Sequence, residues 1–148
     1  MARKYQIWAI LLLMVCVSSC FSDYSKSELA GRTFYADDGA VIRLNNDGSC
    51  QVDNLNWSHV WCKDAACDKH FAHLVDSLNF QKVQVGRWDI DEYDKYQIRM
   101  SMSTFVFSLA LSSGFNVLPT PADEVKLIIF IGDPDDWNTY EFKQRKRK

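Results

Sequence analysis

RTFYADDGAVIRLNNDGSCQVD, residues 32–53, alternates runs of strand-forming residues with turn-forming residues. It contains three short runs rich in β-branched or aromatic residues, at 32–36, 40–44 and 49–53. Asp37-Asp38-Gly39 and Asn45-Asn46-Asp47-Gly48 separate them. Glycine adopts a positive φ without steric penalty, and Asp or Asn tolerates it better than most residues, so both separators are predicted to be hairpin turns. The stretch predicts an antiparallel β-meander.

Further strands are predicted after residue 82. Their apolar residues alternate or form short continuous runs, at 83–90, 98–102, 105–111, 125–131 and 139–143. In the first of these, the apolar phase slips by one position across Gly86, where we expect a β-bulge. In the last, Tyr140 and Phe142 are expected to face inward.

One amphipathic helix is predicted between the meander and the later strands, over about residues 57–78. Val60, Cys67, Phe71, Leu74 and Leu78 fall on one side of a 3.6-residue helix. Trp57 and Trp61 lie one turn apart at its start and fit either core packing or a partner-binding aromatic patch. The fold class is therefore mainly β (α+β): an antiparallel meander forming a small barrel or a two-layer sandwich with one inserted helix.

The N-terminal segment has the layout of a secretory signal. Arg3 and Lys4 precede an uncharged run from Ile7 to Val17, which is followed by Ser18 and Ser19. A membrane-spanning helix needs about 20 mainly apolar residues, and this run is shorter. We expect a cleaved signal rather than a permanent span.

Val17-Ser18-Ser19-Cys20 resembles the lipobox of bacterial lipoproteins, and this resemblance covers residues 1–20. It implies that a dedicated peptidase recognises Val17, Ser18 and Ser19 and cuts before Cys20, whose thiol carries a diacylglyceryl group. Membrane lipid is then the first expected partner, through acylated Cys20. Phe21 stands where an aspartate would suggest inner-membrane retention, so the resemblance favours the periplasmic face of the outer membrane in a Gram-negative host.

The predicted organisation is a signal peptide at 1–19, a lipidated tether at 20–28, a single globular β-rich domain at 29–143 and a basic tail at 144–148. Residues 29–35, the Asn46-Asp47-Gly48 turn and Gly86-Arg87-Trp88 resemble the hairpin pattern of small lipocalin-like and other barrel-forming lipoproteins. Lipocalins place a tryptophan at the position of Thr33, so this resemblance does not imply a ligand-holding calyx.

The remaining cysteines, Cys50, Cys62 and Cys67, would lie in an oxidising compartment after export. Two of the three are expected to pair. We favour a disulfide from Cys50 to either Cys62 or Cys67.

No metal, cofactor or catalytic site is predicted. Cys62, Cys67, His70 and His73 are residue types that bind zinc, but a continuous helix would separate the first from the last by about 16 Å. Asp89, Asp91, Glu92 and Asp94 are interpreted as the polar ends of a hairpin. The chain has no Gly-x-Ser-x-Gly elbow and no phosphate-binding glycine loop, so we expect no enzyme activity.

The charge balance argues against nucleic acid as a partner. The chain has 17 basic and 19 acidic residues, and loss of Arg3 and Lys4 with the signal leaves a formal charge of −4. We expect a non-catalytic binding or accessory module of the cell envelope with a protein partner, for example an inhibitor or immunity protein. The alternative is a structural lipoprotein of an envelope assembly, with the basic tail contacting its neighbour.

Overall fold

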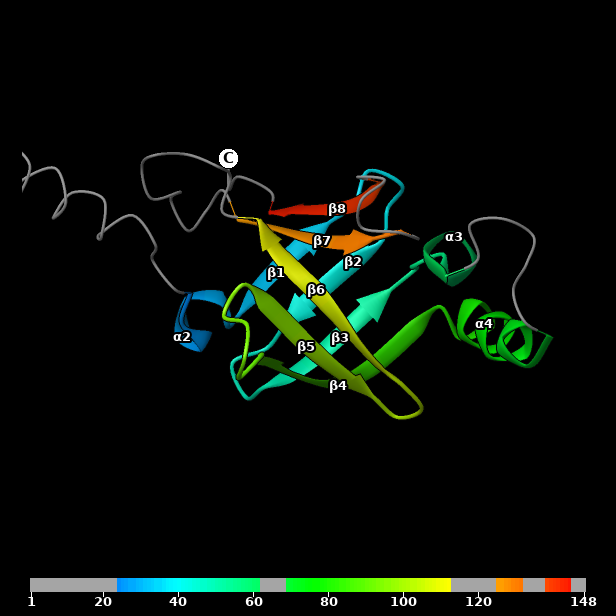
Figure 1. The fold of residues 1–148 in the computed structure, drawn as a ribbon, viewed down its shortest axis with the longest axis horizontal. Helices are drawn as coiled ribbons and strands as arrows, with labels where there is room; N and C mark the ends of the chain where they lie inside the picture. The colour runs from blue at the N-terminus through cyan, green and yellow to red at the C-terminus, as the bar shows by residue number, and fades with distance from the viewer. Residues whose placement is uncertain (1–23, 62–68, 113–124, 132–137, 145–148) are drawn as a thin grey trace, which may run out of the picture.

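A closed antiparallel barrel of eight strands forms the body of the protein (Figure 1). The computed structural model describes residues 24–61, 69–112, 125–131 and 138–144, with the backbone alone at 69–71. The strands are β1 (Arg32–Tyr35), β2 (Val41–Leu44), β3 (Ser49–Asp53), β4 (Val83–Ile90), β5 (Gln97–Met102), β6 (Val106–Ser112), β7 (Lys126–Phe130) and β8 (Thr139–Gln144). Each strand pairs with the next, and β8 pairs with β1. The predicted meander is confirmed, and it forms a barrel rather than a sandwich.

The two predicted hairpin turns are confirmed. Gly39 has a φ of 95° and Gly48 a φ of 81°, in the region that favours glycine. Asp38 Oδ1 accepts the Ala40 N–H at 3.1 Å, and Asp47 Oδ1 accepts the Ser49 N–H at 2.9 Å. The glycines therefore permit the turn conformation, and the carboxylates stabilise it by accepting backbone hydrogen bonds.

Side chains fill the barrel interior. The inward positions of the strands are completely removed from solvent at Phe34, Ile42, Leu44, Val52, Ile98, Met100, Leu109, Leu127 and Phe142. An eight-stranded barrel is just wide enough for its own side chains to fill it. The interior is a packed core.

The predicted bulge at Gly86 is wrong. The register from β3 to β4 runs without interruption through Cys50 opposite Gly86, and Gly86 faces inward in phase with Gln84 and Trp88. A Cβ at position 86 would collide with the Ser101 carbonyl oxygen and lie 2.6 Å from Met102 Sδ. The apparent slip arose because the inward position before Gly86 is a glutamine, whereas Val83 and Val85 point outward.

The inserted helical segment is confirmed, but it is not one helix. α3 (Trp57–Trp61) and α4 (Lys69–Gln81) are separate elements, and the Trp57 N–H donates to Asn79 Oδ1 at 2.9 Å. In a single helix these residues would lie about 33 Å apart. Val60 and Leu78 of the predicted apolar stripe are buried, and Leu74 packs against the core. The helices fold back on one another at one end of the barrel, which we call the helical end (Figure 1).

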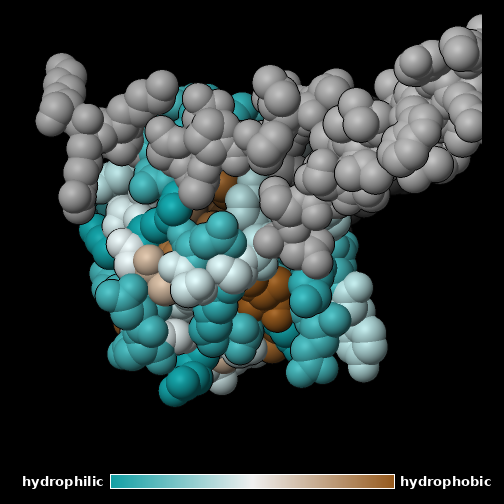
Figure 2. Space-filling model, turned by 90° about the vertical axis from the view of Figure 1, so that its left-hand side faces the viewer, coloured by the Kyte–Doolittle hydropathy of each residue, from teal (hydrophilic) through white to brown (hydrophobic). Residues whose placement is uncertain are grey.

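The opposite end, which we call the α2 end, carries the start of the described chain. The short helix α2 (Lys26–Leu29) lies there, and Tyr24, Leu29 and Trp88 are buried. Figure 2 looks at this end and shows hydrophilic side chains around a small recessed hydrophobic area. The folded domain therefore includes residues of the predicted tether and begins before Leu29.

The last strand reaches one residue beyond the predicted domain boundary. Gln144 pairs with Phe34 of β1, and its side-chain oxygen accepts a hydrogen bond from Arg32 Nη1 at 3.0 Å. Residues 145–148 of the predicted basic tail lie outside the described residues. Within the described segments, no helix is long and apolar enough to cross a lipid bilayer.

Candidate functional site

A polar groove opens at the helical end, where β1 and β8 separate. The two strands pair only at Phe34 with Gln144 and Tyr35 with Lys143, because β1 then enters its turn while β8 extends back to Thr139. The groove has a volume of about 540 Å³. Its lining comes from the β1–β2 turn (Ala36, Asp37, Asp38), from the start of α3 (Asn56, His59) and from β8 (Thr139, Tyr140, Glu141, Lys143).

The groove concentrates negative charge. Its ionisable lining contains three carboxylates, from Asp37, Asp38 and Glu141, one ammonium group, from Lys143, and the His59 imidazole. Lys143 Nζ lies 3.7 Å from Asp37 Oδ2 and 3.8 Å from Glu141 Oε2. The Asp37 side chain is 95% exposed, so this ion pair is screened and weak. Glu141 Oε2 also lies 3.2 Å from Lys126 Nζ, so this carboxylate already has two cationic neighbours. The negative charge available to a cationic ligand therefore comes from Asp37 and Asp38.

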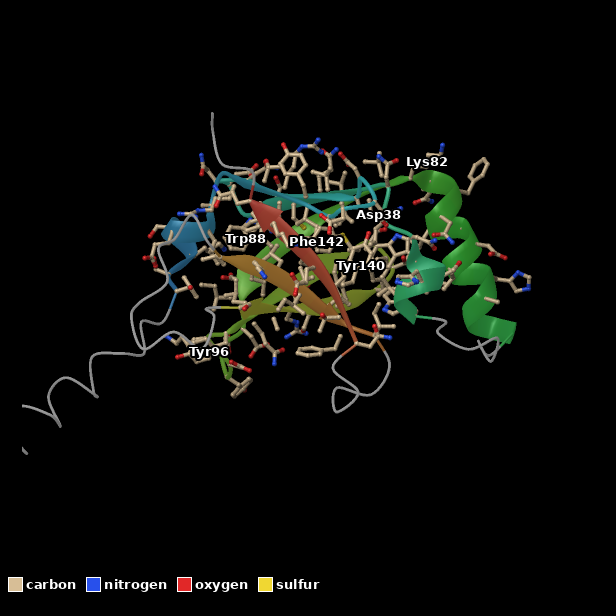
Figure 3. All side chains as sticks on the ribbon, turned by 90° about the horizontal axis from the view of Figure 1, so that it is seen from above. Asp38, Lys82, Trp88, Tyr96, Tyr140 and Phe142 are labelled. Carbon is tan, nitrogen blue, oxygen red and sulfur yellow. The ribbon has the colours of Figure 1, made fainter. Side chains whose placement is uncertain are left out.

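Tyr140 brings a buried hydroxyl to this groove. Among the described residues, its Oη is the one buried side-chain polar atom without a hydrogen bond of standard geometry, and the acceptor that it faces is the Asp38 carboxylate. Burial first, then a hydrogen bond to the Asp38 carboxylate, and then the negative charges of Asp38 and Asp37 raise the pKa of Tyr140 far above its ordinary value. The phenol therefore stays protonated and can donate a hydrogen bond. Figure 3 shows Asp38 and Tyr140 near each other, away from Trp88 and Tyr96.

A second hollow beside the helices uses its polar groups for the fold. It is lined by Asn54, Leu55, Asn56, Ser58, Asn79 and Lys82. Asn79 accepts the Trp57 N–H and donates to Ser58 Oγ, and Asn56 Oδ1 accepts the His59 N–H at the start of α3. These amides already have partners, so the groove at β8 is the stronger candidate site.

Cys50 is a free thiol in the structure, whereas the sequence predicted a disulfide from it. Its side chain points into the packed barrel and is completely buried. Burial raises the pKa of the Cys50 thiol to about 11, which keeps it protonated and poorly nucleophilic near neutral pH. The two predicted partners, Cys62 and Cys67, lie outside the described residues.

The described part of the structure does not show the four zinc candidates at one site. His73 is exposed on α4, while the side chains of Cys62, Cys67 and His70 lie outside the described part. The two separate helices remove the distance argument that we made against a shared metal. Across the described ranges, no group of three His, Cys, Asp or Glu side chains is placed to hold a metal ion.

The acidic residues of the β4–β5 hairpin have the structural role that the sequence predicted. Asp91 Oδ1 accepts the Tyr93 N–H at 2.8 Å, and Asp94 Oδ1 accepts the Tyr96 N–H at 2.9 Å. Asp89 pairs with Lys26 at 3.0 Å. These carboxylates shape the turn and attach α2.

Sequence reasoning did not identify the groove. Its residues come from three separate segments, and Asp37 and Asp38 had been assigned only to a turn. One feature of the sequence could have indicated the groove. A hairpin turn needs one Asp or Asn beside its glycine, whereas the turn before Gly39 has two aspartates, Asp37 and Asp38. The lipidation and signal-peptidase residues, Val17, Ser18, Ser19 and Cys20, lie outside the described residues.

Comparisons with protein-family models, curated proteins and solved structures found no match to this chain.

Proposed function

We propose that this chain is a lipid-anchored binding module of the bacterial cell envelope that recognises a protein partner through the groove at its helical end. Acylated Cys20 holds it at the membrane, on the periplasmic face of the outer membrane in a Gram-negative host. An inhibitor or immunity protein is the specific form that we favour. The proposed activity is binding without catalysis.

The observation that carries this proposal is the position of the groove relative to the start of the folded chain. Tyr24, four residues after Cys20, is buried just before α2, and the groove is lined by residues at the start of α3. Figure 1 shows α2 and α3 at opposite ends of the barrel. Four residues span at most about 14 Å, so a lipid on Cys20 would hold the α2 end close to the bilayer. Two or more acyl chains give a stable anchor. The groove would then face away from the membrane.

The packed interior supports binding at the surface rather than inside the barrel. The inward side chains of the strands are buried against each other, while the groove combines a cation-attracting lining with a buried hydrogen-bond donor.

Site-specific photocrosslinking tests this proposal in cells. A benzoylphenylalanine at exposed His59 should crosslink a protein of the envelope fraction, since this position lines the groove. The matched control is the same residue at Tyr93, an aromatic side chain that is 96% exposed in the β4–β5 turn of the α2 end. The proposal predicts a crosslinked product from position 59 alone. No product from position 59, or the same product from both positions, would contradict it.

A further inference from the structure

The groove runs along an open sheet edge. On one side, β8 pairs with β7 along its length from Thr139 to Lys143. On the other side, it pairs with β1 only at Lys143 and Gln144. Within the described residues, the stretch 139–142 therefore has a ladder partner on one side only. Alternate residues of an antiparallel strand direct their N–H and C=O groups to each neighbour, so this edge offers backbone groups to an added strand.

The wall facing this edge is acidic. The β1–β2 turn places Ala36, Asp37 and Asp38 across the groove from Thr139–Glu141. A strand lies about 4.8 Å from its neighbour, and four residues of strand extend about 13 Å. A segment along 139–142 would pass between the β8 backbone and the two aspartates. Their carboxylates favour lysine or arginine on such a segment.

We propose that the groove binds an extended, basic segment of a protein partner as an additional antiparallel strand on the open edge of β8. The segment would pair with the backbone of 139–142 and place lysine or arginine side chains against Asp37 and Asp38. Main-chain hydrogen bonds would supply affinity, and the acidic turn would supply selectivity. This inference rests on the proposed function, because it specifies how the same groove recognises its partner.

Labelled peptides test strand addition directly by fluorescence anisotropy. The probe is the octapeptide (Lys-Val)4, compared with (Glu-Val)4 and with two N-methylated forms of the first peptide. One form is methylated on every lysine nitrogen and the other on every valine nitrogen. Only one alternating set of N–H groups can face β8. We expect one methylated form to lose at least tenfold in affinity, the other to bind like the parent, and the acidic peptide not to bind.

Charge-matched variants test the role of the acidic turn. Asp37→Asn combined with Asp38→Asn keeps the turn geometry and removes two negative charges. It should weaken binding of (Lys-Val)4 by about threefold to tenfold, the range for two exposed charge pairs. Asp76→Asn with Glu92→Gln makes the same charge change at exposed positions outside the groove and should leave the affinity unchanged. Bound peptide should also slow hydrogen exchange of the amides at 139–142.

Several results of these experiments would contradict strand addition or the proposed function. Equal binding of both methylated forms, equal loss in both variant pairs, or no binding by (Lys-Val)4 would overturn strand addition. Slow hydrogen exchange in the free protein of those amides at 139–142 that do not bond to β7, together with concentration-dependent dimerisation, would assign the edge to a second copy of the chain and would also overturn strand addition to a partner segment. Specific peptide binding without a crosslink from position 59 would refute the proposed function while leaving strand addition standing.

Discussion

Replacing Trp57 with alanine should lower the free energy of unfolding by about 3–5 kcal/mol, the usual cost of removing a large buried aromatic side chain. Trp57, the first residue of α3, is completely buried. Its ring centroid lies 4.7 Å from that of Trp61, 5.0 Å from that of Phe105 and 5.4 Å from that of Phe107. The indole thus joins α3 to β6 and to the segment before it. Alanine would leave a cavity that these rings cannot close.

Urea unfolding followed by far-UV circular dichroism measures this loss. Trp61→Ala is the matched comparison, since Trp61 belongs to the same aromatic cluster but is half-buried. It should cost clearly less than Trp57→Ala. Equal losses from the two variants would mean that the complete burial of Trp57 does not give it a larger contribution to stability than Trp61.

The second large effect is expected at Gln84, the one buried polar or charged residue of the described core. Its Oε1 accepts the Trp57 Nε1–H at 3.1 Å, and its Nε2 donates to the Leu78 carbonyl at 2.8 Å. Gln84 therefore connects β4 to both helices. Leucine has a volume similar to that of glutamine, but Gln84→Leu leaves the Trp57 indole N–H and the Leu78 carbonyl without the hydrogen bonds that Gln84 makes to them. At about 1–3 kcal/mol for each buried unsatisfied group, offset in part by the added apolar burial, the variant should lose about 2–4 kcal/mol.

A double-mutant cycle separates this hydrogen-bond effect from packing. Trp57→Phe removes the indole donor, so Gln84→Leu should cost less in that background than in the wild-type protein. Gln81→Leu, at an exposed position of α4, should change stability by less than about 0.5 kcal/mol. A Gln84→Leu variant as stable as the wild type would show that the network contributes nothing to stability.

The strands were predictable where the signal was local. The turns at Gly39 and Gly48 depend on neighbouring residues, and the first three strands were predicted within one residue of their observed ends. Barrel closure was not predictable, because the pairing of β1 with β8 joins segments that are more than a hundred residues apart.

The errors occurred where tertiary contacts override local pattern. Gln84 faces inward because its amide bonds to both helices, and a polar residue in that position made Gly86 resemble a bulge. The helix was predicted as continuous because its apolar spacing was regular, but Trp57 and Asn79 meet only when α3 and α4 fold back on each other. The groove was missed for the same reason, since Asp38, His59 and Tyr140 come together only after the barrel closes.

We propose that a lipid on Cys20 holds this barrel at a membrane with its groove directed away from the bilayer. Intact mass and membrane fractionation of the protein expressed in a Gram-negative host, wild type beside Cys20→Ala, test this most directly. We predict a wild-type product that begins at Cys20, carries added acyl chains and fractionates with the membrane, and a variant that lacks the acyl mass and the membrane association. An unmodified wild-type product in the soluble fraction would show that Cys20 is not lipidated and does not anchor the protein.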